Sequence, residues 1–66
     1  MILPSDLYKA HMSLHPYLPV EEKVCREYLE MNPIMADCCD LEYVANMFAD
    51  YVGSQGLYEE GAEESW

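Results

Sequence analysis

Positively charged side chains are scarce in this sequence, and their scarcity excludes several classes of function. The 66 residues include three Lys and Arg against thirteen Asp and Glu, which gives a net charge of −10 at pH 7. Nucleic acids and anionic membranes are bound mainly through Lys and Arg. We therefore expect no direct binding of DNA, RNA or a membrane surface, and a protein as the partner.

Long apolar runs and a disulfide pattern are also missing. No stretch approaches the roughly 20 apolar residues that span a bilayer, and the N-terminal Met-Ile-Leu-Pro lacks the basic and apolar regions of a signal peptide. The three cysteines, Cys25, Cys38 and Cys39, cannot all pair within one chain. The sequence therefore predicts an unexported, cytoplasmic protein with reduced thiols.

Groups arranged for catalysis or metal binding are equally hard to find. The segment from Gly53 to Gly56 lacks the lysine and the strand-to-helix context of a phosphate-binding loop. His11 and His15 are four residues apart and could share a metal ion on one helical face, but His15 precedes a proline. We expect His11 to pack between helices, and we predict no enzymatic activity, no catalytic residue, no metal site and no cofactor.

The sequence does contain enough apolar surface for a folded core, since 52% of its residues are hydrophobic. Chains of high charge and low apolar content stay disordered, because self-repulsion opposes compaction. This chain combines high charge with a core, which suggests that its negative surface has a use. A chain of this length is a single domain near the lower size limit for independent folding, so association is expected.

Helical periodicity predicts an all-α fold, a small bundle of two or three helices. The first expected helix covers residues 5–14, with Ser5 or Asp6 as its N-cap. Leu7, His11 and Leu14 lie on its apolar face, at i, i+4 and i+7. Two prolines then interrupt the helix, because the residue before a proline is pushed out of the α region.

The second expected helix covers residues 19–31. Pro19 suits the first helical position, where its missing N–H costs nothing. Asn32 follows as the end of this helix and the cap of the next. The apolar stripe of the second helix is formed by Val20, Val24, Tyr28 and Met31.

The third expected helix covers residues 33–52, with Gly53 as its left-handed C-cap. Apolar residues recur along it at spacings of three and four, which is typical of a seam that packs on another helix. The seam consists of Ile34, Cys38, Leu41, Ala45, Phe48 and Val52. Asp40 leaves a second interpretation, because it could cap a separate helix from Leu41 to Val52; we favour the continuous helix.

Residues 54–66 are predicted to be an acidic, disordered tail attached to a single helical domain of residues 1–53. Two glycines and a short run of glutamates occur in this segment. Leu57, Tyr58 and Trp66 interrupt the run with large hydrophobic side chains. Two interpretations stay open, a solvated tail and a short motif that becomes ordered when a partner binds.

A second apolar band runs along the third helix, away from the seam. At 100° per residue it includes Tyr43, Val44, Met47 and Tyr51, with acidic residues around it. So small a core cannot bury all six tyrosines, and tyrosine is enriched at interface hot spots. We therefore expect a binding surface on the third helix, with acids of the second helix steering the partner. The predicted partner-binding residues are Tyr43, Met47, Tyr51, Asp40, Glu42, Asp50, Glu22, Glu27 and Glu30.

Carboxylates on rigid helices can imitate nucleic-acid phosphates to a basic protein. In size and composition the chain is similar to the small acidic proteins with which phages and mobile elements block nucleases, restriction enzymes or transcription factors, although no shared motif supports that analogy. We predict a protein-binding modulator, an inhibitor of a basic nucleic-acid-handling protein that partly mimics nucleic acid. The alternative is a structural or assembly protein that forms a homodimer through residues 33–52.

Overall fold

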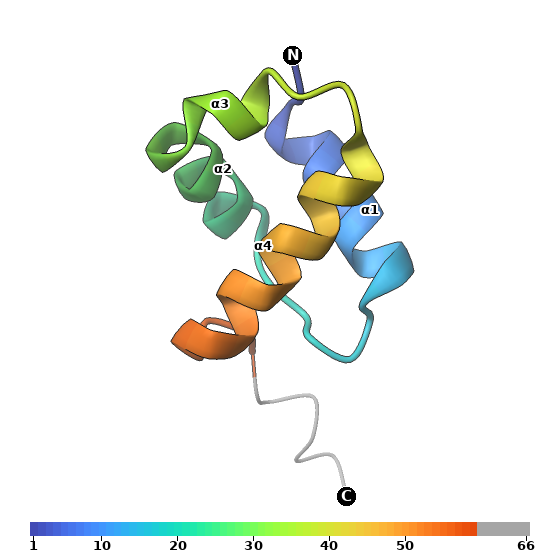
Figure 1. Ribbon diagram of the computed structural model, residues 1–66. Helices are drawn as coiled ribbons and strands as arrows, with labels where there is room; N and C mark the ends of the chain where they lie inside the picture. Colours follow the sequence, from blue (N-terminus) through green and yellow to red (C-terminus); the bar gives the residue numbers. More distant parts are fainter. Residues whose placement is uncertain (60–66) are drawn as a thin grey trace, which may run out of the picture.

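The computed structural model describes residues 1–59 and contains four helices and no strand in that range. The helices are α1 (Pro4–Leu14), α2 (Glu22–Met31), α3 (Pro33–Ala36) and α4 (Leu41–Gln55). α1 packs against both α2 and α4, and the single-turn α3 follows α2 before the chain enters α4 (Figure 1). The predicted all-α bundle is confirmed. Within residues 1–59, no helix is long and apolar enough to cross a membrane.

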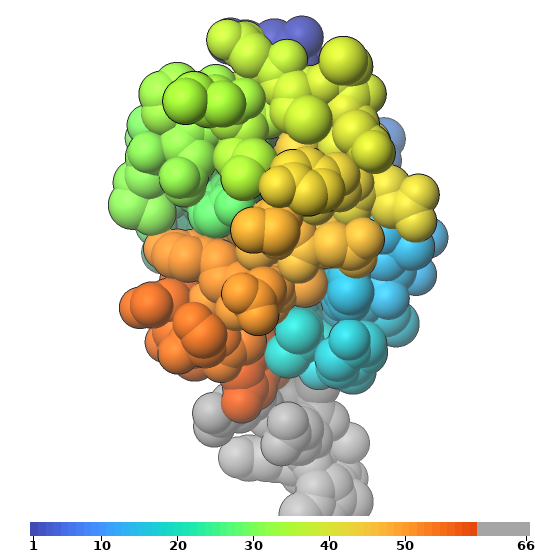
Figure 2. All heavy atoms as spheres, in the orientation of Figure 1, coloured from blue at the N-terminus to red at the C-terminus, as the bar shows by residue number. Residues whose placement is uncertain are grey.

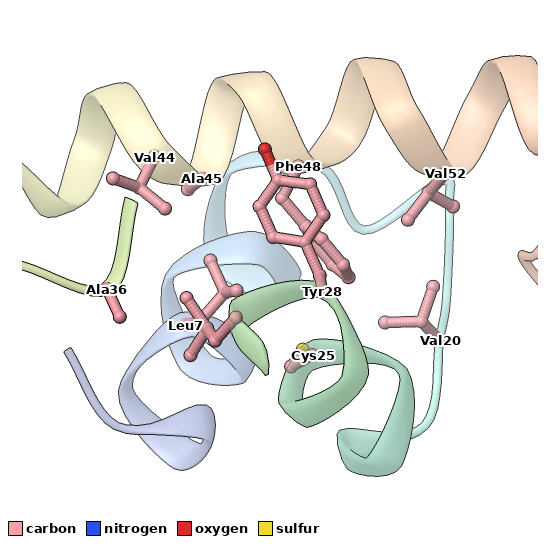
Figure 3. Packing of buried hydrophobic residues seen from close by; sticks show 10 residues of the cluster. Leu7, Val20, Cys25, Tyr28, Ala36, Val44, Ala45, Phe48 and Val52 are labelled. Carbon is pink, nitrogen blue, oxygen red and sulfur yellow. The ribbon is translucent and has the colours of Figure 1, made fainter. Parts of the chain in front are cut away.

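The core is centred on Phe48 of α4, whose side chain is fully buried. Tyr28 reaches from α2 to this ring (Figure 3), and the two ring centroids are 5.1 Å apart in an edge-on arrangement. The ring of His11 approaches Phe48 from α1, with centroids 5.0 Å apart. Edge-to-face aromatic contacts of this kind add to the free energy gained by burial alone. The remaining fully buried apolar side chains are Leu7, Cys25, Val44, Ala45 and Val52.

α1 ends at Leu14 as predicted, but it begins at Pro4 and its N-terminal cap differs from the prediction. The N-cap residue is Leu3, and no side chain caps the helix, so the assignment of Ser5 or Asp6 was wrong. Proline has no N–H to satisfy and its fixed φ fits the first helical turn. The Leu3 carbonyl accepts the first helical bond from the N–H of Leu7 at 3.0 Å.

α2 begins three residues later than predicted, at Glu22. Pro19 stays outside the helix, and its carbonyl accepts a hydrogen bond from the N–H of Glu59 at 2.7 Å. Val20 is buried in the core, and Glu21 has an extended backbone. The segment before α2 is therefore held extended by contacts with the far end of the chain, which the local sequence does not reveal.

Residues 33–52 form two helices, so the prediction of one continuous helix was wrong and the alternative that Asp40 caps a separate helix is confirmed. The Asp40 backbone is extended, and its Oδ1 accepts the N–H of Tyr43 at 3.1 Å. Ile34, the first member of the predicted seam, is 85% exposed. Ala36 is buried in its place, and its carbonyl accepts the N–H of Ile2 at 2.7 Å.

Asn32 also acts differently from the prediction. Its side chain makes no cap on α3. Instead its Nδ2 donates to the carbonyl of Tyr28 at 3.0 Å, one turn back in α2. The side chain therefore adds a second hydrogen bond to a carbonyl that already accepts the Asn32 backbone N–H at 3.0 Å, and it caps no free N–H at the start of the next helix.

α4 continues past Gly53 and ends at Gln55, so the assignment of Gly53 as C-cap was wrong. Gly56 takes that role with φ 67°, a left-handed conformation that suits glycine. The N–H of Leu57 then donates to the Val52 carbonyl at 3.1 Å. The expected domain boundary at residue 53 thus falls inside α4.

Part of the predicted tail is packed on the helices. Tyr58 is half-buried against the core, and the Glu59 N–H is bonded to the Pro19 carbonyl. Residues 60–66, with Trp66 and most of the predicted acidic run, lie outside the described residues.

Candidate interaction surface on α4

α4 buries one side and exposes the other. Its buried residues are Val44, Ala45, Phe48, Ala49 and Val52. The predicted second apolar band is divided by this packing: Val44 is fully buried and Tyr51 is half-buried. Tyr43 and Met47 point outward, with 49% and 38% of their surfaces exposed. These two residues, four apart on one helical face, are the apolar part of the surface that the band predicted.

Tyr51, the remaining tyrosine of the predicted band, packs against the core. Its ring centroid lies 5.0 Å from that of Tyr28 and 6.3 Å from that of Phe48. Burial raises the pKa of Tyr28, and the neighbouring Tyr43, Tyr51 and Asp50 raise it further. The Tyr28 hydroxyl therefore stays protonated beside the α4 surface. Tyr51, predicted as a partner contact, is half-buried and packs against Tyr28 and Phe48.

Carboxylates border the exposed pair. Asp50 lies within about 60° of both Tyr43 and Met47 around the helix axis, and Glu42 lies about 100° from Tyr43 on the same side as Asp50. Both acids are exposed. Asp40 is exposed at the start of the helix, where its carboxylate also serves as the cap. We refer to Tyr43, Met47, Asp40, Glu42 and Asp50 as the α4 face; Figure 2 shows α3 and α4 occupying much of one side of the molecule.

None of these acids has a cationic partner among the described residues. Within residues 1–59 the only ion pair joins Lys23 to Glu21, 3.8 Å apart and well exposed on both sides. α3 and α4 contain no Lys, Arg or His. The carboxylates of the α4 face therefore set up a negative potential that no nearby side chain neutralises.

The distribution of charge along the sequence is a signal that helical periodicity does not capture. All three Lys and Arg residues occur by Arg26, where three acids balance them. The other ten acids occur from Glu27 onward, in a segment with no Lys, Arg or His. The whole net charge of −10 thus belongs to residues 27–66. A count of charge along the chain, rather than its total, places the acidic part after Arg26: two of the ten acids lie in α2, two in the loop before α4, two in α4 and four at positions 59–64.

The predicted acids of α2 do not join the α4 face as one group. Glu22, Glu27 and Glu30 are all exposed. Glu22 and Glu27 lie about 140° apart around the helix axis, so they face different directions. Glu30 lines a cavity at the N-terminal end of the molecule. Asp40, Glu42 and Asp50 therefore lie in α4 or at its start, whereas the α2 acids point in different directions.

The N-terminal cavity is open and mainly apolar, with a volume of about 320 Å³. It lies beside α2 and includes none of the α4 face. The side chains that define it are those of Ile2, Leu3, Leu29 and Ala36, with Arg26 and Glu30 as the charged groups.

Three apolar residues that periodicity places on packed faces are exposed. Leu14 at the end of α1 is 42% exposed. Met31 at the end of α2 is 58% exposed, and Ile34 of α3 is 85% exposed. The prediction that these three residues pack is wrong, because periodicity gives the spacing of a face but not the neighbour that covers it.

The histidines and cysteines show what chemistry the fold provides. His11 is fully buried, as expected for packing between helices, and its Nε2 lies 2.6 Å from the Leu18 carbonyl oxygen. Residues 1–59 contain no group of three or more His, Cys, Asp or Glu that could hold a metal ion. Burial, aided by Glu22, raises the pKa of the Cys25 thiol to about 12, which keeps it protonated and unreactive.

Comparisons of the chain with protein-family models, with curated proteins and with solved structures find no match. The exposed aromatic and acidic residues of α4 are thus the basis on which a role can be assigned.

Proposed function

We propose that the chain binds a basic protein through the α4 face and inhibits it, and that this partner handles nucleic acid. The observation that carries the proposal is the exposed pair Tyr43 and Met47 beside carboxylates that lack any cation. A role of this kind is typical of the small acidic inhibitors of phages and mobile elements.

The two components of the α4 face supply different parts of binding. Unneutralised carboxylates on a rigid helix attract Lys and Arg over distance and accelerate encounter, an effect that salt weakens. A large aromatic side chain buried on contact supplies most of the affinity of a typical hot spot. Tyr43 can also accept an Arg or Lys of the partner over its ring face. A basic surface with an apolar depression fits both components.

Partial mimicry of nucleic acid follows from the same geometry. Glu42 and Asp50 are eight residues apart on one helix, about 12 Å along its axis. A protein that grips phosphates with Lys and Arg can accept these carboxylates in their place. Tyr43 and Met47 add contacts that the phosphate backbone does not offer, so they would give the inhibitor specificity for one basic protein.

Self-association through α4 is the alternative, and the charge of the surface opposes it. A two-fold dimer brings the same patch of both copies together. Asp40, Glu42 and Asp50 would then meet their own copies with no cation on either helix. Like charges in apposition are unfavourable, so a basic heterologous partner fits this face better than a second copy.

The direct test is affinity capture of basic proteins by the chain and by a Tyr43→Ala/Met47→Ala variant. The wild-type chain is expected to retain a partner that about 0.5 M salt releases, because the attraction is screened. The variant should lose that partner while its helical circular dichroism is unchanged. A Leu14→Ala/Tyr17→Ala variant is the matched control, because those side chains are 42% and 68% exposed and lie outside α4. Equal retention by all three proteins would remove the α4 face from the proposal.

Two further measurements separate the modes of action. Added DNA should displace the retained partner if the chain occupies its nucleic-acid site, whereas simultaneous binding would indicate inhibition elsewhere. Sedimentation at low and high salt tests the alternative of assembly. A tight dimer that persists at both salt concentrations and is abolished by the Tyr43→Ala/Met47→Ala variant would favour the assembly role.

A further inference from the structure

His11 is the one buried polar side chain among the described residues, and it lies where three segments meet. Its ring projects from α1, its Nε2 contacts the Leu18 carbonyl of the linker, and its edge contacts Phe48 of α4. These contacts hold the end of α1 and the linker against the central residue of α4. A change in the charge of this ring would act on all three segments.

The contacts of His11 require a neutral ring. A carbonyl only accepts hydrogen bonds, so Nε2 must carry the proton that it donates to Leu18. Nδ1 is buried and has no hydrogen-bond partner among residues 1–59. Protonation of Nδ1 would place a cation and an unsatisfied N–H in the core, and both are costly to bury.

Apart from the Leu18 carbonyl, the surroundings of His11 offer no compensation for a positive charge. The ring of His15 lies 5.6 Å away, and it bonds Tyr17 through Nδ1 at 3.1 Å and Asn46 of α4 through Nε2 at 2.8 Å. The linker thus presents the Leu18 carbonyl and the Tyr17 hydroxyl, and α4 presents Phe48 and Asn46. None of the groups found to shift the pKa of His11 is a carboxylate.

Burial lowers the pKa of His11 below its ordinary value, and the positive charge of His15 lowers it further. The hydrogen bond to the Leu18 carbonyl opposes these two effects without outweighing them. The folded chain therefore resists protonation at His11, while the unfolded chain accepts the proton at the usual pH.

We propose that His11 is a pH-sensitive switch built into the α1–α4 contact, which loosens α1 and the linker from α4 in mild acid and so disorganises the α4 face. The consequence for a partner rests on the proposed function, but the switch itself does not. Binding would then be strong near neutral pH and lost on mild acidification.

The direction and window follow from proton linkage. An unfolded histidine titrates near pH 6.5, and the buried ring titrates lower, so between the two values the unfolded state binds more protons. The contribution of His11 to folding stability is therefore fully present above about pH 6.5. It falls as pH decreases, by up to about tenfold in the folding equilibrium per pH unit. Carboxylates titrate near pH 4, where protonation reduces the repulsion among them. The window between about pH 6.5 and 5 thus lies above the range in which the carboxylates titrate.

The test is thermal unfolding followed by circular dichroism between pH 7.5 and 5 for the wild-type chain, His11→Gln and His15→Gln. Glutamine at position 11 keeps a donor for the Leu18 carbonyl and does not titrate. The wild-type chain and His15→Gln should lose stability as pH falls, and His11→Gln should give a flat profile. An equal slope in His11→Gln and the wild-type chain would overturn the proposal.

A second measurement decides the matter even if His11→Gln fails to fold. Nuclear magnetic resonance of the imidazole protons in the wild-type chain follows both histidines, and His15→Gln assigns them. The His11 signal should stay unshifted where an ordinary histidine titrates, near pH 6.5, and lose dispersion together with the Phe48 ring signals as the pH falls further. A His11 ring that titrates at the ordinary pH with Phe48 unchanged would contradict the switch. Neither measurement needs a partner protein. Failure of the switch proposal is therefore distinct from failure of the proposed function.

Discussion

The segment up to Arg26 and the segment after it contribute to one core but carry different charge. Residues 1–26 include α1, the linker and the first half of α2, and their three acids are matched by three cations. Residues 27–66 contain ten acids and no Lys, Arg or His. Leu7 from the first segment and Phe48 from the second are both fully buried.

The two segments share the core but differ in the charge that they place on the surface. Both segments bury apolar side chains in the same cluster, so the asymmetry of charge does not arise from the core. Repulsion among the ten acids opposes folding. α4 carries two of these acids, Glu42 and Asp50, without a cation, and it exposes Tyr43 and Met47, whereas in α1 Asp6 is accompanied by Lys9.

Removing the residue at which the two segments meet should have the largest effect. Phe48→Ala leaves a cavity against α1 and α2 and is expected to cost about 3–5 kcal/mol of unfolding free energy. Met47→Ala, its exposed neighbour, should change stability by no more than about 0.5 kcal/mol. Urea denaturation followed by circular dichroism measures both. Equal stability of the two variants would show that the core does not join the segments at Phe48.

Charge reversal in the two segments should have unequal effects on partner binding. Glu42→Lys/Asp50→Lys is expected to weaken the affinity for the captured partner by about tenfold or more and to reduce the salt dependence of binding. Asp6→Lys/Glu21→Lys changes the net charge by the same amount in the first segment. It should weaken binding much less, because both residues lie outside α4. Equal losses would mean that the partner responds to total charge, and the comparison between segments would fail.

Asp40, one of the acids of the second segment, has a structural role as the cap of α4. Its replacement should have a smaller effect than the Phe48 substitution or the charge reversals. Asp40→Ala removes the cap on α4 and is expected to cost about 1 kcal/mol of unfolding free energy. Asp37→Ala removes the same charge from the same loop. Because no side-chain hydrogen bond of Asp37 occurs among those of residues 1–59, it should cost little. Urea denaturation of both variants isolates the cap, and equal losses would leave Asp40 without that role.

Much of the fold could be predicted from local periodicity, and the deviations have long-range causes. The seam through Ala45, Phe48 and Val52 packs as its spacing predicts, because helical geometry alone aligns these residues. Pro19, predicted as the first residue of α2, lies outside it, and its carbonyl accepts the N–H of Glu59, 40 residues away in the chain. No propensity of residues 19–22 could reveal it.

The candidate site was predictable in part for the same reason. The helical wheel identified Tyr43 and Met47 as a band apart from the seam, and both are exposed. It could not decide that Tyr51 would turn toward Tyr28, since that depends on where α2 packs. Nor could it place Glu30 at the N-terminal cavity, which requires the tertiary position of Ile2.

The five methionines provide the most direct test of the claim that a basic partner docks on α4. Their methyl groups can be labelled with carbon-13, and they report separately on the N-terminus, on α1, on the end of α2, on α3 and on α4. On addition of the captured basic protein, the Met47 methyl signal should shift or broaden first and the Met12 signal of α1 should stay unchanged. A shift of Met12 with Met47 unaffected would contradict the assignment of the binding surface to α4.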